Sequence, residues 1–172
     1  MPHPTHHLFL SYSRKDNRPS ALGVEGWITA FCRRLQTTHQ QLYEANPNSA
    51  QAADDLATSQ ERLATIQQGV QDWDAARGSF QQSLELRQVL FESNPNSIYV
   101  ARRLVVVLYQ MGKLGTQSRD NEYATQHLNL CFHLLDHCIT SGMQFDPLLM
   151  QLHEQLRSIF QNRGDTQHEN LH

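Results

Sequence analysis

The chain contains an internal repeat, and this repeat limits its possible folds more than any other feature. Residues Leu42 to Ser49 read Leu-Tyr-Glu-Ala-Asn-Pro-Asn-Ser, and residues Leu90 to Ser97 read Leu-Phe-Glu-Ser-Asn-Pro-Asn-Ser, at an offset of 48 residues. A fixed period of about 20–50 residues is typical of stacked repeat proteins. Such units bury their apolar faces against their neighbours. The sequence therefore predicts a short α-solenoid.

Apolar positions continue the same register through three copies without a gap. The corresponding residues are Leu56, Leu104 and Leu152; Leu63, Met111 and Ile159; Ala76 and Ala124; and Phe80 and Leu128. Helical spacing within each copy indicates amphipathic helices. We therefore expect an all-α fold, built from antiparallel helix pairs.

Turn residues divide the chain into helices. Proline cannot continue a helix, and Asn or Ser accepts hydrogen bonds from the free N–H groups at a helix start. The predicted helices span about 27–45, 50–68, 73–92, 98–111, 122–139 and 147–162. We expect 98–111 to be central because it is apolar on several sides, 112–120 to form a loop, and Gly164 to end the last helix. Residues 165–172 are predicted to form a disordered tail.

Composition and charge argue against several classes of partner. The net charge is −3 and Lys and Arg are not clustered, so no nucleic-acid or polybasic membrane surface is indicated. The apolar run from Leu104 to Leu108 is far shorter than the roughly 18 residues of a membrane span. The N-terminus lacks a signal-peptide pattern, and the odd number of cysteines suggests reduced thiols. We expect a cytoplasmic protein.

Histidines and cysteines are the candidate metal ligands. His3, His6 and His7 lack a Cys or carboxylate at ligand spacing. In the second cluster His133 and His137 are four residues apart, which suits zinc. However, Cys131 and Cys138 fall on the apolar stripe of the helix, whereas these histidines point elsewhere. We therefore expect core cysteines, surface histidines and no metal or other cofactor.

No catalytic site is indicated by the sequence. The chain has no Gly-rich phosphate loop, and its Ser, His and Asp residues have no spacing that suggests a triad. We expect a protein that is not an enzyme and has no catalytic residues.

The N-terminal region resembles the opening of a bacterial TIR domain. The resemblance is carried by Leu8 to Asn17 (Leu-Phe-Leu-Ser-Tyr-Ser-Arg-Lys-Asp-Asn) and by Gly26 to Phe31. The residue pattern itself predicts a short strand at Leu8–Ser11 and an amphipathic helix with Trp27, Phe31 and Leu35 on one face. The resemblance implies that this strand is the first of a parallel sheet and that the helix packs on it. The remaining strands, the TIR–TIR contact loop and the catalytic glutamate of that family have no counterpart. The resemblance therefore implies a truncated TIR-like segment at 1–40.

A lone strand of this kind needs hydrogen-bonding partners. It could fray, lie against the solenoid, or pair with another chain at an open edge. The helix 27–45 extends from the TIR-like segment into the position of a repeat helix. We interpret it as a fused helix that serves as the N-terminal cap of the solenoid.

The repeat region, 41–164, resembles tetratricopeptide (TPR) repeats. The matching positions are Leu63-Ala64, Ala76, Phe80 and Ser83, and Met111-Gly112, Ala124, Leu128 and Cys131. The period is longer than the usual one of about 34 residues, as in the long-helix variant that accompanies TIR domains in bacterial signalling proteins. Gln67 and Gly115 depart from the pattern because an aromatic residue is usual there.

The resemblance implies a protein-binding scaffold whose concave face is lined by the first helix of each pair. Carried over by position, the candidate partner-binding residues are Thr58, Glu61, Thr65, Gln68, Val106, Tyr109, Lys113, Glu154, Arg157 and Gln161. This mixture suits a peptide with a charged end, although ordinary solvated helix faces remain an alternative.

The function expected from these resemblances is a noncatalytic protein–protein interaction module related to bacterial TIR signalling or defence proteins. Its partner would be a protein or peptide, and another TIR protein could bind through the N-terminal strand. Two alternatives remain open. The segment could complete a TIR NAD-cleaving enzyme or a TIR assembly with another chain, or the chain could have a fold but no selected role.

Overall fold

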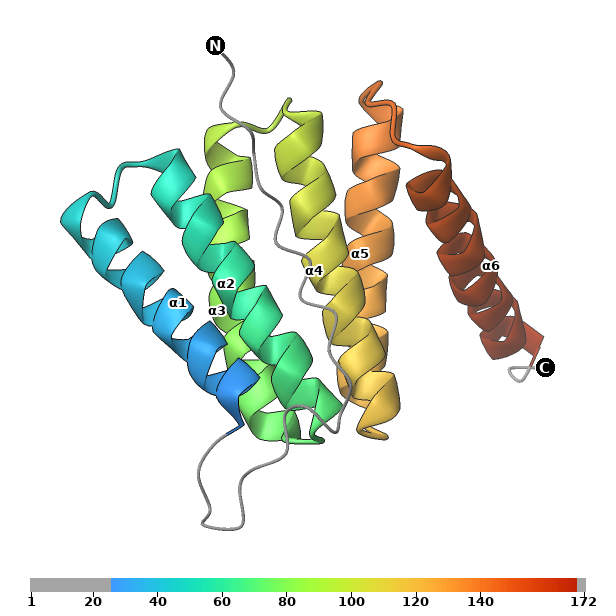
Figure 1. The fold of residues 1–172 in the computed structure, drawn as a ribbon. Helices are drawn as coiled ribbons and strands as arrows, with labels where there is room; N and C mark the ends of the chain where they lie inside the picture. The colour runs from blue at the N-terminus through green and yellow to red at the C-terminus, as the bar shows by residue number, and fades with distance from the viewer. Residues whose placement is uncertain (1–25, 170–172) are drawn as a thin grey trace.

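The computed structural model describes residues 26–169, with side chains described as far as Phe160, and this part of the chain is all-α. The helices are α1 (Trp27–Ala45), α2 (Ala50–Gly69), α3 (Trp73–Ser93), α4 (Ile98–Gln117), α5 (Asn121–Thr140) and α6 (Pro147–Glu169) (Figure 1). No strand occurs between residues 26 and 169. The strand expected at Leu8–Ser11 lies outside the described residues.

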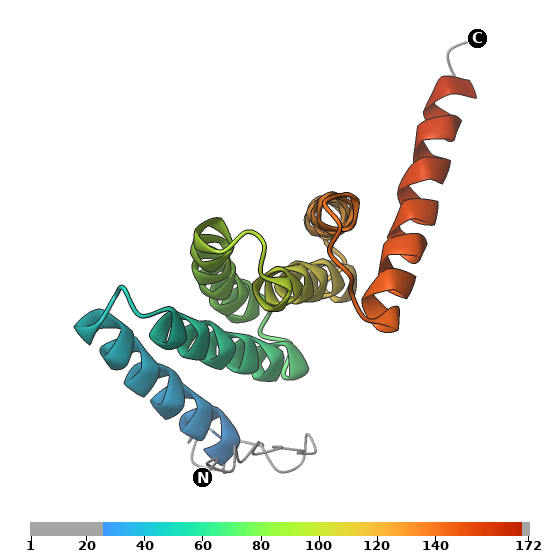
Figure 2. The ribbon, with the colours of Figure 1, turned by 90° about the horizontal axis from the view of Figure 1, so that it is seen from above.

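Neighbouring helices pack in pairs. The most extensive packing joins α2 with α3 and α4 with α5, while α1 packs on α2 and α3 packs on α4. Helix α6 packs mainly on α5, less extensively than the other neighbouring helices pack on each other, and it projects away from them when the molecule is seen from above (Figure 2). This arrangement of adjacent helix pairs is compatible with an α-solenoid.

The internal repeat is reproduced in the local backbone structure. Ser49 and Ser97 each accept a hydrogen bond from the third residue that follows, at the starts of α2 and α4. Asp72 and Asp120 do the same at the starts of α3 and α5. The residues before these aspartates, Gln71 and Arg119, have positive φ angles of 65° and 60°. Equivalent side chains thus produce equivalent turns 48 residues apart.

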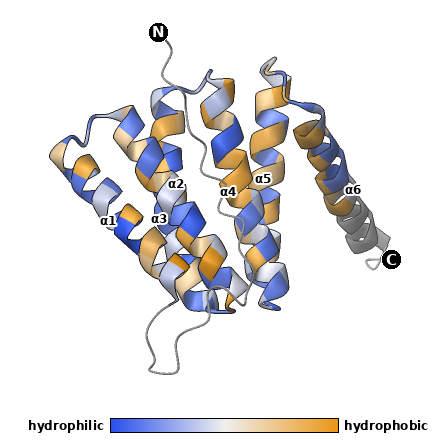
Figure 3. Ribbon diagram, in the orientation of Figure 1, coloured by the Kyte–Doolittle hydropathy of each residue, from blue (hydrophilic) through white to orange (hydrophobic). Residues whose placement is uncertain are grey.

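The main core is centred on α4, as predicted. Helix α4 packs against both α3 and α5, and hydrophobic residues run along α4 and α5 (Figure 3). The buried residues of this core are Ala64, Ala76, Phe80, Leu84, Leu104, Val105, Val107, Leu108, Met111, Leu114, Cys131, Leu135, Leu149 and Leu156. Burial of such side chains is the main favourable contribution to folding.

Two predicted helix ends are wrong. Helix α4 continues through the expected loop at 112–120 as far as Gln117. A Cβ atom on Gly112 would lie 2.5 Å from the Leu128 side chain, and one on Gly115 would lie 2.5 Å from the backbone nitrogen of Ala124. These glycines therefore permit close helix packing instead of forming a turn. Helix α6 likewise continues beyond Gly164 to Glu169.

The helix of the third copy starts one residue later than the repeat predicts. The first backbone hydrogen bonds of α2 and α4 reach Ser49 and Ser97, whereas the equivalent bond of α6 reaches Asp146, 49 residues after Ser97. Six residues, 141–146, join α5 to α6, whereas four residues, 94–97, join α3 to α4. The longer connection therefore delays the start of α6 by one residue.

Burial in α6 keeps the offset of 48 residues at three positions, because the buried Leu149, His153 and Leu156 correspond to the buried Ala101, Val105 and Leu108 of α4. Ile159, which was expected to match the buried Met111, is instead 47% exposed.

Helix α1 packs on α2 through a different face from the one expected. Ile28 and Cys32 are buried and cluster with Ile66 of α2. Trp27 and Phe31, predicted to share the apolar face, are instead 61% and 42% exposed. The expectation failed because both faces of this helix carry apolar residues, and periodicity alone does not decide between them.

Candidate functional site

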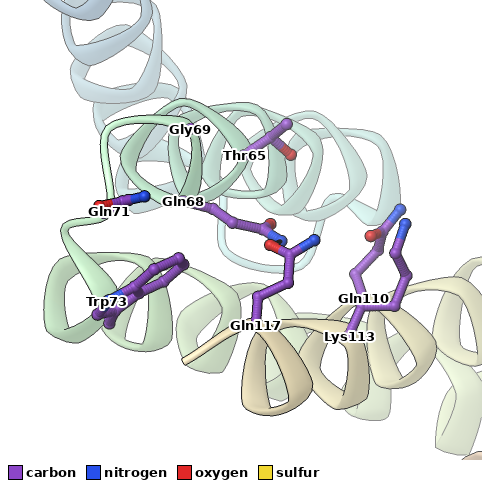
Figure 4. A pocket seen from close by; sticks show the side chains of 8 residues that line it. All are labelled: Thr65, Gln68, Gly69, Gln71, Trp73, Gln110, Lys113 and Gln117. Atoms are coloured by element: carbon purple, nitrogen blue, oxygen red, sulfur yellow. Dashed lines mark hydrogen bonds between the residues drawn. The ribbon is translucent and has the colours of Figure 1, made fainter. Parts of the chain in front are cut away.

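A polar pocket of about 610 Å³ lies where the C-terminal ends of α2 and α4 meet the start of α3. Its lining comprises Thr65, Gln68, Gly69, Gln71, Trp73, Gln110, Lys113 and Gln117 (Figure 4). Three of these residues, Thr65, Gln68 and Lys113, belong to the predicted partner-binding set. Of the others, Gly69 ends α2, Gln71 lies in the turn that follows, Trp73 begins α3, and Gln110 and Gln117 belong to α4.

Side chains from two helices meet across this pocket. The Gln68 Nε2 group on α2 donates a hydrogen bond of 2.6 Å to Gln117 Oε1 on α4. The Thr65 hydroxyl donates to the carbonyl of Glu61 within its own helix, at 2.8 Å. The indole of Trp73 lies on the α3 side, facing these amides (Figure 4). The pocket therefore combines amide groups with one aromatic surface.

Lys113 supplies the only charged side chain in the lining of this pocket. Its ammonium group lies 5.8 Å from the ring centroid of Tyr109, another predicted residue, which is half-buried. Among the residues that the structure describes, Lys113 has no ion-pair partner. The pocket therefore has a positive charge that is available to an anionic group.

Glu61 and Thr58 are engaged by a second arrangement, a buried polar network centred on Arg87. Arg87 is fully buried, and its Nε donates to Glu61 Oε1 at 3.0 Å. The Ser83 hydroxyl donates to the same oxygen, and Arg87 Nη2 donates to the Thr58 hydroxyl at 2.9 Å. Arg87 also pairs with Asp54. The charge of Glu61 is therefore already compensated within the fold.

Helix α4 extends this network across the boundary between the two helix pairs. Arg103 donates to Thr58 Oγ1 at 2.6 Å, and the Tyr99 hydroxyl donates to Asp54 at 3.0 Å. Partial burial, followed by this hydrogen bond to a carboxylate, raises the pKa of Tyr99. The network links α2, α3 and α4, which indicates a structural role.

The remaining predicted residues are not brought together by the structure. Val106 on α4 is half-buried, and Glu154 and Arg157 are exposed on α6. Neither α6 residue lines the pocket. The Gln161 side chain lies outside the described residues.

A second pocket of about 600 Å³ lies between α1 and α3, over α2. It is lined by Gln36, Gln40, Tyr43, Leu56, Gln60, Gln82, Glu85, Leu86 and Val89. None of the predicted partner-binding residues takes part, and Glu85 gives the pocket a negative charge. The first pocket, which is called the α2–α4 pocket below, is therefore the stronger candidate for a partner-binding site.

Four residues of the cysteine and histidine cluster on α5 lie as predicted, whereas its His127 is buried and not on the surface. Cys131 and Cys138 are fully buried, and His133 and His137 are exposed. Among the side chains that the structure describes, residues 26–160, no group of three or more His, Cys, Asp or Glu is placed to hold a metal ion. Burial raises the pKa of the Cys131 thiol to about 12, and it also raises the pKa of Cys138.

The native thiols of Cys131 and Cys138 are expected to resist alkylation. The thiolate is the reactive form, and a raised pKa together with burial keeps both groups protonated and inaccessible at mildly alkaline pH. Iodoacetamide labelling followed by peptide mass spectrometry would measure this, with the guanidinium-unfolded chain as the fully reactive control. Equal labelling rates in the two states would contradict the buried positions.

Comparison with known proteins identifies no relative. Nothing matches the chain among protein-family models, curated proteins or solved structures. The α2–α4 pocket is therefore the feature of the molecule from which a function can be inferred.

None of the described helices combines the length and the apolar character needed to cross a membrane.

Proposed function

We propose that this chain is a noncatalytic protein–protein interaction module, a TPR-like α-solenoid that binds a partner protein or peptide in the cytoplasm. The observation that carries the proposal is the α2–α4 pocket, which gathers Thr65, Gln68 and Lys113 from two helices. Binding sites combine apolar surface with a few placed polar groups, and Trp73 and the amides provide both. The proposed binding site needs no group from α6.

A relationship to bacterial TIR signalling or defence proteins belongs to the same proposal. Its support is the stretch from Leu8 to Asn17, which lies outside the described residues. A TIR protein is therefore one candidate partner. Consumption of NAD by the chain mixed with a TIR protein, but not by either alone, would favour the alternative of a completed NAD-cleaving enzyme.

The double substitution Gln68→Ala and Lys113→Ala is expected to reduce partner capture by at least about fivefold, because it removes a hydrogen-bonding amide and the pocket's charge. The full chain and the variant would be immobilised side by side, exposed to native lysate and compared by quantitative mass spectrometry. Circular dichroism would establish that both are folded.

Gln81→Ala is the matched control, because Gln81 is exposed on α3 and outside the pocket. It should leave capture unchanged. Failure of the wild-type chain to retain any partner, or equal retention by the double variant, would contradict the proposed binding site.

A further inference from the structure

We infer that the α2–α4 pocket recognises an acidic peptide segment in extended conformation, with a carboxylate at Lys113 and an apolar side chain at Trp73. This inference depends on the proposed interaction function and specifies the chemistry of the partner. It is carried by the charge of the pocket, by the unused hydrogen-bonding groups of its glutamines and by the position of the indole.

Charge selects the acidic partner. Lys113 is exposed, no carboxylate lines the pocket, and Lys113 lacks an ion-pair partner among the described residues. Nearby Glu61 does not offset this charge, because Arg87 and Arg103 lie 3.0 Å and 3.6 Å from its oxygens. A carboxylate of the partner would therefore meet one uncompensated cation, whereas a basic partner would be repelled.

The glutamine pair selects the peptide backbone. The bond between Gln68 and Gln117 uses one N–H of the first amide and the oxygen of the second. It leaves the oxygen of one amide as an acceptor and the amino group of the other as a donor. If the oxygen and nitrogen atoms of both amides are interchanged, one free acceptor and one free donor still remain. One acceptor beside one donor complements the N–H and C=O groups of a peptide unit.

An extended segment is favoured over a helix for the same reason. The interior N–H and C=O groups of an α-helix bond to each other, so they cannot use the glutamine pair. An extended chain leaves these groups free for a partner and directs alternate side chains to opposite sides. It could therefore contact both glutamines while placing neighbouring side chains against other parts of the pocket.

Trp73 provides the apolar contact. Its indole is half-buried, packs against the main core and lies at the side of the pocket opposite the glutamine pair (Figure 4). An aromatic surface held in this way can pack against an aliphatic or aromatic side chain with little loss of conformational freedom. The recognised segment should therefore combine an acidic residue with an apolar one nearby.

Selection from a library of random nonapeptides displayed on phage, with the full chain immobilised, would test the inference. We expect enrichment of sequences that contain Asp or Glu close to an aromatic or aliphatic residue. A synthetic peptide with the consensus sequence would then be titrated by fluorescence anisotropy at several salt concentrations. Its affinity should fall with increasing salt because the main charge contact is exposed.

Lys113→Glu should weaken binding of the consensus peptide by at least about fivefold and should shift selection toward Lys- and Arg-containing peptides. The double variant Gln68→Ala and Gln117→Ala should weaken binding without changing the preference for acidic residues. Arg34→Glu, which changes an exposed residue on α1 by the same charge, is the control and should have no effect.

Three outcomes would overturn the inference: a basic consensus, a consensus with helical spacing, or no enrichment from the library. If lysate capture is nevertheless lost in the variant with Gln68→Ala and Lys113→Ala, the interaction module remains supported and only the acidic-peptide chemistry is wrong. If capture also fails with the wild-type chain, both proposals are wrong.

Discussion

Replacement of Arg87 by alanine is expected to lower the free energy of unfolding by about 3–5 kcal/mol, the range found when one partner of a buried ion pair is removed. Arg87 is 0% exposed and contacts Asp54, Thr58 and Glu61 on α2. Its removal would leave the carboxylates of Asp54 and Glu61 without this partner, although their side chains are only 18% and 17% exposed. Arg103 remains near Glu61, so we expect the lower end of this range.

Urea unfolding followed by circular dichroism would measure this loss. Arg102→Ala is the matched control, because Arg102 also forms an ion pair, with Asp146 at 2.8 Å, but its side chain is 50% exposed. Exposed pairs contribute about 0–1 kcal/mol. Similar losses in the two variants would contradict a structural role for the Arg87 network.

Further variants can show whether this loss of stability comes from the unpaired carboxylates or from poorer packing. The second helix pair has Leu135, fully buried, where the first has Arg87. An apolar side chain is therefore compatible with this position in the repeat. The triple variant Arg87→Leu, Asp54→Asn and Glu61→Gln should be more stable than Arg87→Leu alone, because no carboxylate is left unpaired. An equal loss in both variants would assign the effect to packing.

The sequence predicted the helices best where local chemistry defines their ends. The Asn-Pro-Asn-Ser turns place Ser49 and Ser97 as caps, and α2 and α4 begin directly after them. Such caps depend on residues close in the chain, so they can be inferred without the tertiary structure. The end of α1 at Ala45 was predicted correctly for the same reason.

Features that depend on contacts between helices were not predictable in this way. Gly112 and Gly115 suggested a loop, because glycine has the same local preference whether it forms a turn or admits a neighbouring helix. Gln117 was therefore not assigned to a helix and did not enter the predicted partner-binding set. Arg87 was also missed, although its position four and seven residues after Ser83 and Phe80, on a buried stripe, was a usable signal.

Gly115→Ala is expected to destabilise the chain by about 3 kcal/mol, near the upper end of the usual cost of overpacking. The added Cβ would lie 2.5 Å from the nitrogen and 2.7 Å from the Cα of Ala124. These are backbone atoms of α5, so relief requires movement of the whole helix. At Gly112 the nearest atoms belong to the Leu128 side chain, which can change its rotamer, so Gly112→Ala should cost less.

Gly78→Ala is the control for this substitution, because it makes the same chemical change at an exposed position of α3 where an added Cβ meets nothing within 4 Å. Alanine has the higher helix propensity, so this variant should be more stable by about 0.5–1 kcal/mol. Thermal and urea unfolding of the three variants should therefore rank Gly78→Ala above the wild type, then Gly112→Ala, then Gly115→Ala. A stabilising effect of Gly115→Ala would mean that α4 and α5 do not approach as closely as the structure describes.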